Sequence, residues 1–262
     1  MSETQSKIAQ AELAAIRLIL CDIDGCLNAG FVSPLHLVTL ARIAAQVTRL
    51  RAHGVTVTLC TGRPTGYAQA IAQALGITTQ MVVENGAALL DPINGQVITL
   101  AADADRAALS RFAERLMRDP HWAGRLSQET GKQACLSLNS PEISHRPSSQ
   151  IRKLMTELRA VPGAEQFDWA HSTTAIDITP KGINKASGAA QLLDELKLDW
   201  SAVAAIGDSQ NDLPVLERAA LGLCPNNAEA SVRERATLTS PKPYAEGVEY
   251  LLGLFEEEHT DD

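Results

Sequence analysis

Residues 18–27 read Leu-Ile-Leu-Cys-Asp-Ile-Asp-Gly-Cys-Leu, an apolar run that ends in two carboxylates one residue apart. The apolar residues predict a short buried strand over residues 17–21. Like charges at this spacing repel each other, so a strand alone gains nothing from Asp22 and Asp24. The pair becomes favourable if a divalent cation neutralises it, or if one carboxylate is a nucleophile and the other carries a proton.

The segments around this strand alternate between strand and helix patterns, which is typical of a parallel sheet with helices on its faces. Such sheets bind ligands at the carboxyl ends of their strands. Asp22, Thr61 and Asn85 each follow the end of a predicted strand. The predicted strands cover 17–21, 55–60, 80–83, 202–206 and 221–224, and the predicted helices cover 35–53, 65–75, 185–196, 213–220 and 248–255.

The pattern changes between these two blocks. Residues 91–95 read Asp-Pro-Ile-Asn-Gly and predict a hairpin turn. Hairpin strands mixed with two helices indicate a separate α+β layer of ordinary small-domain size. We therefore expect an α/β core formed by 1–86 and 180–262, with a smaller α+β domain inserted at 87–179. Within the insert, helices are predicted at 102–117 and 148–159, and strands at 133–138 and 175–179.

Composition excludes several classes of partner. The net charge of −8 gives no electrostatic reason to expect a nucleic acid or an acidic membrane surface. The five cysteines are odd in number and show no CxxC spacing, which predicts buried, reduced thiols and a cytoplasmic protein. The polar first ten residues predict no signal peptide, and no run is apolar enough to predict a transmembrane span.

Four short segments concentrate the reactive groups. Together they supply carboxylates, a lysine, a hydroxyl and an amide, each at a predicted strand end or helix start. Magnesium prefers oxygen ligands, and a phosphoryl group is bound by a cation, a hydroxyl and backbone N–H groups. This inventory fits magnesium-assisted phosphoryl transfer. The segments are Asp22-Ile-Asp24-Gly25, Thr61-Gly62-Arg63, Lys185 after Gly182-Ile-Asn, and Gly207-Asp208 with Asn211-Asp212.

These four motifs, in this order, resemble those of the haloacid dehalogenase superfamily. The inserted segment falls between the second and third motifs, where the family carries its larger cap domain. Residues 84–86, Glu-Asn-Gly, and the length of the insert resemble the subgroup with a small α/β cap. That subgroup includes Cof-type, sucrose-phosphate and archaeal-type phosphoglycolate phosphatases. The resemblance implies a Rossmann-like parallel-sheet core with a cap that sets substrate specificity.

The resemblance also implies chemical roles. Asp22 is expected to be the nucleophile, forming an aspartyl-phosphate. Asp24 is expected to protonate the leaving alcohol and then deprotonate the attacking water, with its side chain free for this task. Dehalogenation needs no such proton, whereas departure of an alkoxide does, so the second aspartate favours a phosphatase.

For the cofactor, the resemblance implies Mg²⁺ held by Asp22, the main-chain carbonyl of Asp24, and Asp208. Asp212 is expected to orient Lys185 or a metal-bound water.

For the phosphate, the resemblance implies that Thr61 and Lys185 bind the phosphoryl oxygens. Gly62 belongs to the same phosphate-binding segment, and Asn211 is expected to contact the phosphate or the substrate.

Several assignments stay open from the sequence. Arg63 fits either a substrate contact or a structural ion pair, and Asn85 either lines the site or only makes a left-handed turn. Lys181 is a rival to Lys185. Cys26 stands where the family usually has threonine, so that the loop loses a hydroxyl. The basic or titratable candidates for substrate contact on the insert are Arg152, Lys153, His145 and His171.

We therefore predict a magnesium-dependent phosphatase that hydrolyses a small phosphomonoester, either a sugar phosphate or a phosphoglycolate-like ester. Its partner is expected to be that small molecule, and the chain is expected to be a monomer or a small homo-oligomer. The alternative within enzymes is a phosphosugar mutase, which returns the phosphoryl group to a sugar. The alternative from another class is a non-catalytic phosphosugar-binding module.

Overall fold

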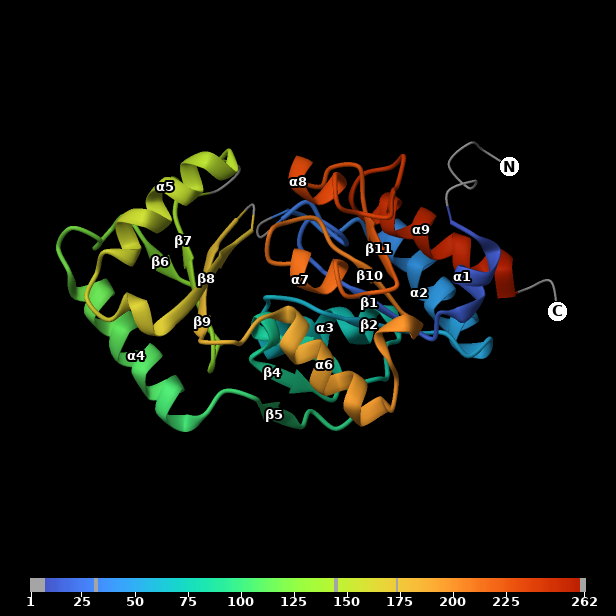
Figure 1. The fold of residues 1–262 in the computed structure, drawn as a ribbon, viewed down its shortest axis with the longest axis horizontal. Coiled ribbons are helices and arrows are strands. Elements are labelled where there is room, and N and C mark those ends of the chain that lie inside the picture. Colours follow the sequence, from blue (N-terminus) through green and yellow to red (C-terminus); the bar gives the residue numbers. More distant parts are fainter. Residues whose placement is uncertain (1–7, 31–32, 144–145, 173, 260–262) are drawn as a thin grey trace.

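The structure, a computed structural model, describes residues 8–30, 33–143, 146–172 and 174–259. They form two bodies, one built around a parallel sheet and the other around an antiparallel sheet (Figure 1). The chain passes between the bodies twice, after β5 and after β9. The predicted α/β class is therefore confirmed. His145 lies outside the described residues.

The larger body, the core, contains a five-stranded sheet in the order β12-β11-β10-β1-β2, and all its strand pairs are parallel. The opening apolar run is its central strand, β1. All four residues of β1 are buried, as expected for a parallel strand covered on both faces. The strands are β1 (Leu18–Cys21), β2 (Thr56–Leu59), β10 (Val203–Ile206), β11 (Leu221–Cys224) and β12 (Leu238–Thr239).

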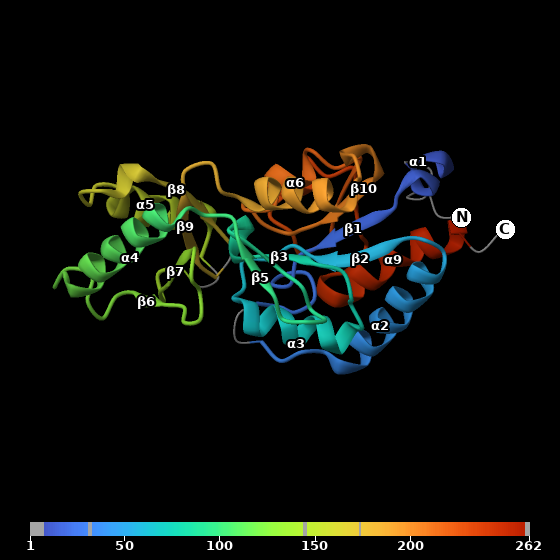
Figure 2. The same ribbon diagram turned by 90° about the horizontal axis from the view of Figure 1, so that it is seen from below.

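Helices cover both faces of this sheet (Figure 2). Successive side chains of a strand point to opposite faces. Ile19 therefore packs with α2, α3 and α9, whereas Leu18 and Leu20 pack with α6 and α7. The helices of the core are α1 (Gln10–Ala15), α2 (Leu37–Ala52), α3 (Thr65–Leu75), α6 (Lys185–Leu196), α7 (Leu213–Leu216), α8 (Ala230–Arg233), α9 (Tyr244–His259) and the short 3₁₀ helices η2 (Glu84–Gly86) and η4 (Trp200–Ala202).

A small antiparallel sheet extends the core beyond β2. It consists of β3 (Met81–Val83), β4 (Ala88–Leu90) and β5 (Val97–Thr99), and a single parallel bridge joins Val82 to Cys60. We expected residues 87–100 in the inserted layer, but the structure places this hairpin in the core. The reason is that Leu89 and its neighbours pack into the same clusters as β1 and α6.

The smaller body spans residues 103–180, and we call it the cap layer. Its four-stranded sheet has the order β6-β7-β9-β8, with every pair antiparallel. Ile176 and Ile178 pack against its two helices, which lie on the side away from the core (Figure 1). The alternate residues Asp177 and Thr179 line the space toward the core. The elements are α4 (Asp103–Arg118), β6 (Ser127–Gln128), β7 (Leu136–Asn139), α5 (Ser148–Arg159), η3 (Ala164–Gln166), β8 (Phe167–His171) and β9 (Ile176–Pro180).

A helical turn is predicted near residues 11–16, where the structure has α1. Three strands and one α-helix were not expected from the sequence. β6 and β12 are two residues each and α8 is four, too short for any periodicity to show. β8 reads Phe-Asp-Trp-Ala-His and lies at the edge of its sheet, so the alternation of buried residues is weak. The limits of the two domains stay a prediction. Because the hairpin packs on the core, the cap layer begins after the hairpin and not at residue 87.

Candidate active site

The reactive segments meet at the carboxyl edge of the parallel sheet. Asp22 follows β1, and its backbone N–H donates to the carbonyl of Ile206 at the end of β10 (3.0 Å). Thr61 follows β2, and Asp208 follows β10 by two residues. Because these strands are parallel neighbours, segments almost two hundred residues apart in the sequence lie side by side.

The loop after Asp22 closes tightly on Asp208. Gly25 has a φ of 79°, and a Cβ placed on it would lie 2.0 Å from a carboxylate oxygen of Asp208. Only glycine allows the backbone this conformation and this approach. The loop therefore forms a narrow cradle in front of two buried carboxylates.

Cys26, which follows Gly25, is fully buried, and its backbone N–H donates to the carbonyl of Ile23 (3.2 Å). Burial raises the pKa of its thiol well above the ordinary value. A buried thiol that stays protonated is a poor nucleophile, so Cys26 contributes packing to the loop.

Lys185 is the cation at the centre of the cluster. Its Nζ lies 2.9 Å from Oδ2 of Asp22 and 2.6 Å from Oδ1 of Asp212, and its side chain is 1% exposed. Asn184 caps α6 by accepting the N–H groups of Ala186 and Ser187, which fixes Lys185 as the first helical residue. Burial opposes the charge of Lys185, but the two carboxylates outweigh it and raise its pKa.

Lys181, the rival, lies elsewhere. Its exposed side chain pairs with Asp168 (3.0 Å) on the cap layer.

Asp212 acts as an anchor for this arrangement. Its second oxygen, Oδ2, accepts the backbone N–H groups of Asp208 and Ser209, both at 3.0 Å. A Cβ on Gly207 would lie 2.4 Å from the Cβ of Asp212, so glycine is needed there as well. Asp212 thus holds Lys185 with one oxygen and the Asp208 loop with the other.

The cluster buries more negative than positive charge. Oxygens of Asp22, Asp208 and Asp212 lie within 4.8 Å of one another, and Lys185 is the cation in contact with Asp22 and Asp212. Burial raises the pKa of Asp22 to about 7 and that of Asp208 well above its ordinary value. Oδ1 of Asp22 is buried with no hydrogen-bond partner among the described residues. Clusters that are rich in carboxylate oxygens and carry an excess of negative charge can hold a divalent cation.

The segment after β2 lies beside the aspartates. Thr61 is fully buried, and its Oγ1 accepts the backbone N–H of Arg63 (3.2 Å). Asn85 has the expected left-handed conformation, with a φ of 56°. Its Oδ1 accepts from Nδ2 of Asn211 (3.1 Å), and a Cβ on Gly62 would lie 2.8 Å from its Nδ2. The structure therefore brings Asn85 and Asn211 into direct contact, from segments that the sequence separates widely.

Arg63 forms the ion pair that the sequence left open. It holds Asp24 with two bonds, from Nε (2.5 Å) and Nη2 (2.7 Å), and its Nη1 lies 3.3 Å from Oε1 of Glu129. The guanidinium also stacks over the ring of Tyr67, 4.3 Å from its centroid. We expected the side chain of Asp24 to be free. The structure corrects this, because a two-bond pair with arginine fixes the carboxylate.

Sequence reasoning missed the cap residues that complete this network. Lys132 is 2% exposed and lies 2.8 Å from Oε2 of Glu129 and 3.8 Å from Oδ1 of Asp177. Ser137 donates to the same oxygen of Asp177, and Lys132 also bonds Ser137. These residues carry no motif, and their spacing matches no helix or strand face. Only the contact between the two bodies makes them neighbours of Arg63.

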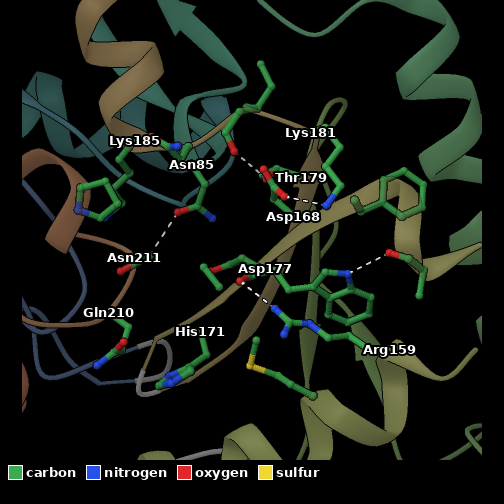
Figure 3. Close-up of a pocket in the computed structure, with 18 of the residues that line it drawn as sticks. Asn85, Arg159, Asp168, His171, Asp177, Thr179, Lys181, Lys185, Gln210 and Asn211 are labelled. Carbon is green, nitrogen blue, oxygen red and sulfur yellow. Dashed lines mark hydrogen bonds and ion pairs between the residues drawn. The ribbon is translucent and has the colours of Figure 1, made fainter.

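Two cavities lie between the bodies. A chamber of about 30 Å³ is bordered by Asp22, Asp24 and Arg63 on the core side, and by Glu129 and Lys132 on the cap side, among others. A larger cleft, of about 970 Å³, opens beside it. Figure 3 shows this cleft, with core residues on one side and strands of the cap layer on the other. Residues common to both linings are Asp177 and Asn211.

The basic candidates on the insert separate by position. Arg152 and His171 line the cleft, and His171 is 3% exposed. Lys153 is exposed on α5 and is not part of that lining.

No helix in the described part of the chain has the length and hydropathy needed to cross a bilayer.

The chain resembles known proteins over almost its whole length. A family model described as haloacid dehalogenase-like hydrolase matches residues 19–121 and 133–252. The phosphoglycolate phosphatase of Aeropyrum pernix is 26% identical over 239 residues, covering 91% of this chain and 92% of that one. The 5-amino-6-(5-phospho-D-ribitylamino)uracil phosphatase of Bacillus subtilis is 24% identical over 244 residues, with 91% and 95% covered.

Among solved structures, that of the Thermoplasma acidophilum protein 0175 aligns with this chain with a TM-score of 0.70 at 20% sequence identity. The alignment covers 92% of this chain and 98% of that one. It supports the same two-body fold.

Proposed function

Since the chain belongs to the haloacid dehalogenase-like hydrolases and is a phosphatase, we propose that it hydrolyses a small phosphomonoester with Mg²⁺ through an aspartyl-phosphate on Asp22. The observation that carries this proposal is the buried cluster of Asp22, Lys185, Asp208 and Asp212 at the carboxyl edge of the sheet. Phosphoryl transfer depends mainly on positioning and charge stabilisation, and this cluster supplies both.

In the proposal, donors around Asp22 bind the phosphoryl oxygens. Lys185 lies within hydrogen-bond distance of Asp22, and Thr61 follows the neighbouring strand. In the proposal, these two side chains and the backbone at Gly62 hold the phosphoryl group against Asp22. Asn211, fixed by Asn85, borders both cavities and contacts the phosphate or the rest of the substrate.

The donor set fits a magnesium ion. In the proposal, Asp22, the main-chain carbonyl of Asp24, and Asp208 hold it, and Asp212 supports the site by fixing the Asp208 loop. The buried, unpartnered Oδ1 of Asp22 and the cradle at Gly25 support this assignment. When bound, Mg²⁺ neutralises the carboxylates and stabilises charge on the phosphoryl oxygens.

Asp24 is proposed as the acid and base, with Arg63 as its holder. In the proposal, Asp24 gives a proton to the leaving oxygen in the first step and takes one from the attacking water in the second. The two-bond pair with Arg63 holds the carboxyl group in place for both steps.

The direct test is release of inorganic phosphate from a panel of phosphomonoesters, with p-nitrophenyl phosphate as a generic substrate. We expect activity with Mg²⁺, loss of activity in EDTA, and recovery when Mg²⁺ is returned. Phosphate release that persists in metal-free buffer would contradict the metal assignment. Failure to release phosphate from any ester would contradict the proposed reaction.

The pH dependence of metal binding gives a second prediction. The pKa of Asp22 rises from its ordinary value of 3.8 to about 7, mainly through burial. Between these two values the folded protein holds more protons than the unfolded chain, so the stability of the metal-free protein falls as the pH rises. Mg²⁺ needs the ionised carboxylate and competes with that proton. Added MgCl₂ should therefore raise the Tm more at about pH 8 than at about pH 5.5.

Thermal unfolding followed by circular dichroism measures this difference. Asp22→Asn is the matched control, because it removes the titrating group, and its Mg²⁺-induced shift should be smaller. A wild-type shift that is equal at both pH values, or larger at the acidic one, would show that Asp22 does not bind the ion.

The cytoplasm is the compartment we propose. All five cysteines are buried free thiols. Unpaired thiols are typical of proteins that work in a reducing compartment.

A further inference from the structure

The chamber beside Asp24 decides what kind of alcohol the enzyme can release. If Asp24 protonates the leaving oxygen, as the proposed function requires, the first atoms of the leaving group lie in this chamber. Its lining on the cap side consists of Glu129, Lys132, Ser172, Thr174, Ala175 and Asp177. The two relatives named above act on esters of two kinds, one with a carboxylate next to the ester and one with a hydroxyl-rich chain.

Both cations of the chamber already have carboxylate partners. Arg63 is shared by Asp24 and Glu129, and Lys132 is shared by Glu129 and Asp177. The lining holds four carboxylates. Asp22 pairs with Lys185, which lies outside the lining, so Asp24, Glu129 and Asp177 share the two cations. An incoming carboxylate would have to displace one of these partners, which costs free energy and disfavours it.

Asp177 offers the chamber an acceptor instead. It lies on β9, between β7 and β8, on the face of the cap sheet toward the core. Its Oδ1 is used by Ser137 and lies near Lys132, and no hydrogen bond among the described residues uses its Oδ2. Asp177 is 5% exposed and borders the chamber. It also lines the cleft, where Figure 3 shows it. An acceptor that borders both cavities can take a hydrogen bond from a donor that enters either one, such as a hydroxyl group.

The rest of the cap lining is neutral. Ser172 and Thr174 border the chamber and lie 3.4 Å apart through their hydroxyl oxygens. Hydroxyl groups can both donate and accept, so they suit other hydroxyl groups. Asn211 lines both the chamber and the cleft of about 970 Å³, so the two cavities adjoin at this residue. That volume takes an alcohol much longer than two carbons.

We propose that the substrate is the phosphomonoester of a neutral, hydroxyl-rich alcohol of the polyol or sugar type, and that Asp177 selects it by accepting a hydrogen bond from one of its hydroxyl groups. The inference rests on the proposed phosphatase function and narrows it. Glycolate, by contrast, carries its carboxylate on the carbon next to the ester, where Glu129 and Asp177 repel it.

Two pairs of substrates test this directly, because each pair differs only by a hydroxymethyl group in place of a carboxylate. They are 2-hydroxyethyl phosphate against 2-phosphoglycolate, and glycerol 3-phosphate against 3-phosphoglycerate. We expect kcat/KM to favour the hydroxyl member of each pair by about tenfold or more. This comparison uses the wild-type protein and needs no variant.

The Asp177→Asn variant tests whether Asp177 causes this preference for the hydroxyl member of each pair. The amide keeps the size of the side chain and an acceptor for Ser137, but removes the charge. We expect the ratio of kcat/KM within each pair to fall about tenfold, through better hydrolysis of the carboxylate ester and poorer hydrolysis of the other. Asp105→Asn is the matched control. Asp105 is exposed on α4 and lines neither the chamber nor the cleft, so its ratio should stay at the wild-type value.

The outcomes separate the two levels of the proposal. Hydrolysis of p-nitrophenyl phosphate with equal or greater activity on the carboxylate esters would overturn this inference and leave the phosphatase function intact. Wild-type selectivity that survives in a folded Asp177→Asn protein would also overturn the role of Asp177. Absence of phosphate release from every ester would instead overturn the proposed function.

Discussion

The Asp22→Asn variant should lose turnover of phosphomonoesters by about 10³-fold or more while remaining folded. An amide is a far weaker nucleophile than a carboxylate, and the change leaves the shape of the site intact. Removing the charge should not harm the fold, because burial already raises the pKa of Asp22 to about 7. Lys185 also keeps its contact with Asp212 (2.6 Å).

Steady-state phosphate release and thermal unfolding, measured on the same preparation, check this prediction. Asp194→Asn is a matched control, since Asp194 is exposed on α6, and it should retain wild-type activity. A folded Asp22→Asn protein with near-wild-type rates would remove Asp22 from the role of nucleophile.

The Lys185→Met variant should show the largest loss of stability. Replacing the lysine leaves Asp22 and Asp212 buried without the ammonium group that both contact. Breaking a buried ion pair from one side typically costs about 3–5 kcal/mol. For a chain of this size, such a loss lowers the Tm by roughly 10 °C. Catalysis should also fail, because the phosphoryl oxygens lose their cation.

Urea denaturation and calorimetry in metal-free buffer measure this cost. Lys153→Met is the control, because Lys153 is exposed on α5 and should change the free energy of unfolding by less than about 0.5 kcal/mol. If Lys185→Met unfolds with nearly the wild-type free energy, Lys185 is not the counter-charge of the cluster.

Three helices of the fold could be predicted closely from local signals, whereas α7 ends earlier than predicted and α9 is longer at both ends. The limits of α3, α5 and α6 coincide with the predicted ranges 65–75, 148–159 and 185–196. Each has apolar residues at helical spacing, and Asn184 supplies a capping side chain before α6. Stop and start residues act over a few positions, so the sequence shows them directly.

The placement of the hairpin at residues 88–99 could not be predicted in this way. Its turn was recognised, but which body a hairpin packs on depends on tertiary contacts of Leu89 and its neighbours with β1 and α6. Local patterns carry no information about that choice.

In the candidate site, too, local motifs could be recognised from the sequence, whereas tertiary contacts could not. The motifs allowed Asp22, Asp208 and Lys185 to be named, and the structure brings them together at one edge of the sheet. Sequence reasoning missed Glu129 and Lys132, and it left Asp24 free. Both errors concern contacts of Arg63 that are distant in the sequence. Arg63 pairs with Asp24 across 39 residues within the core, and it meets Glu129 of the cap layer across 66 residues.

The stereochemical course at phosphorus tests the central claim most directly. A phosphomonoester made chiral with oxygen isotopes is hydrolysed in isotopically labelled water, and the configuration of the phosphate released is determined. Each in-line displacement inverts phosphorus, so attack by Asp22 followed by attack by water predicts overall retention. Inversion would show that water attacks the substrate in a single step, and would contradict an aspartyl-phosphate on Asp22.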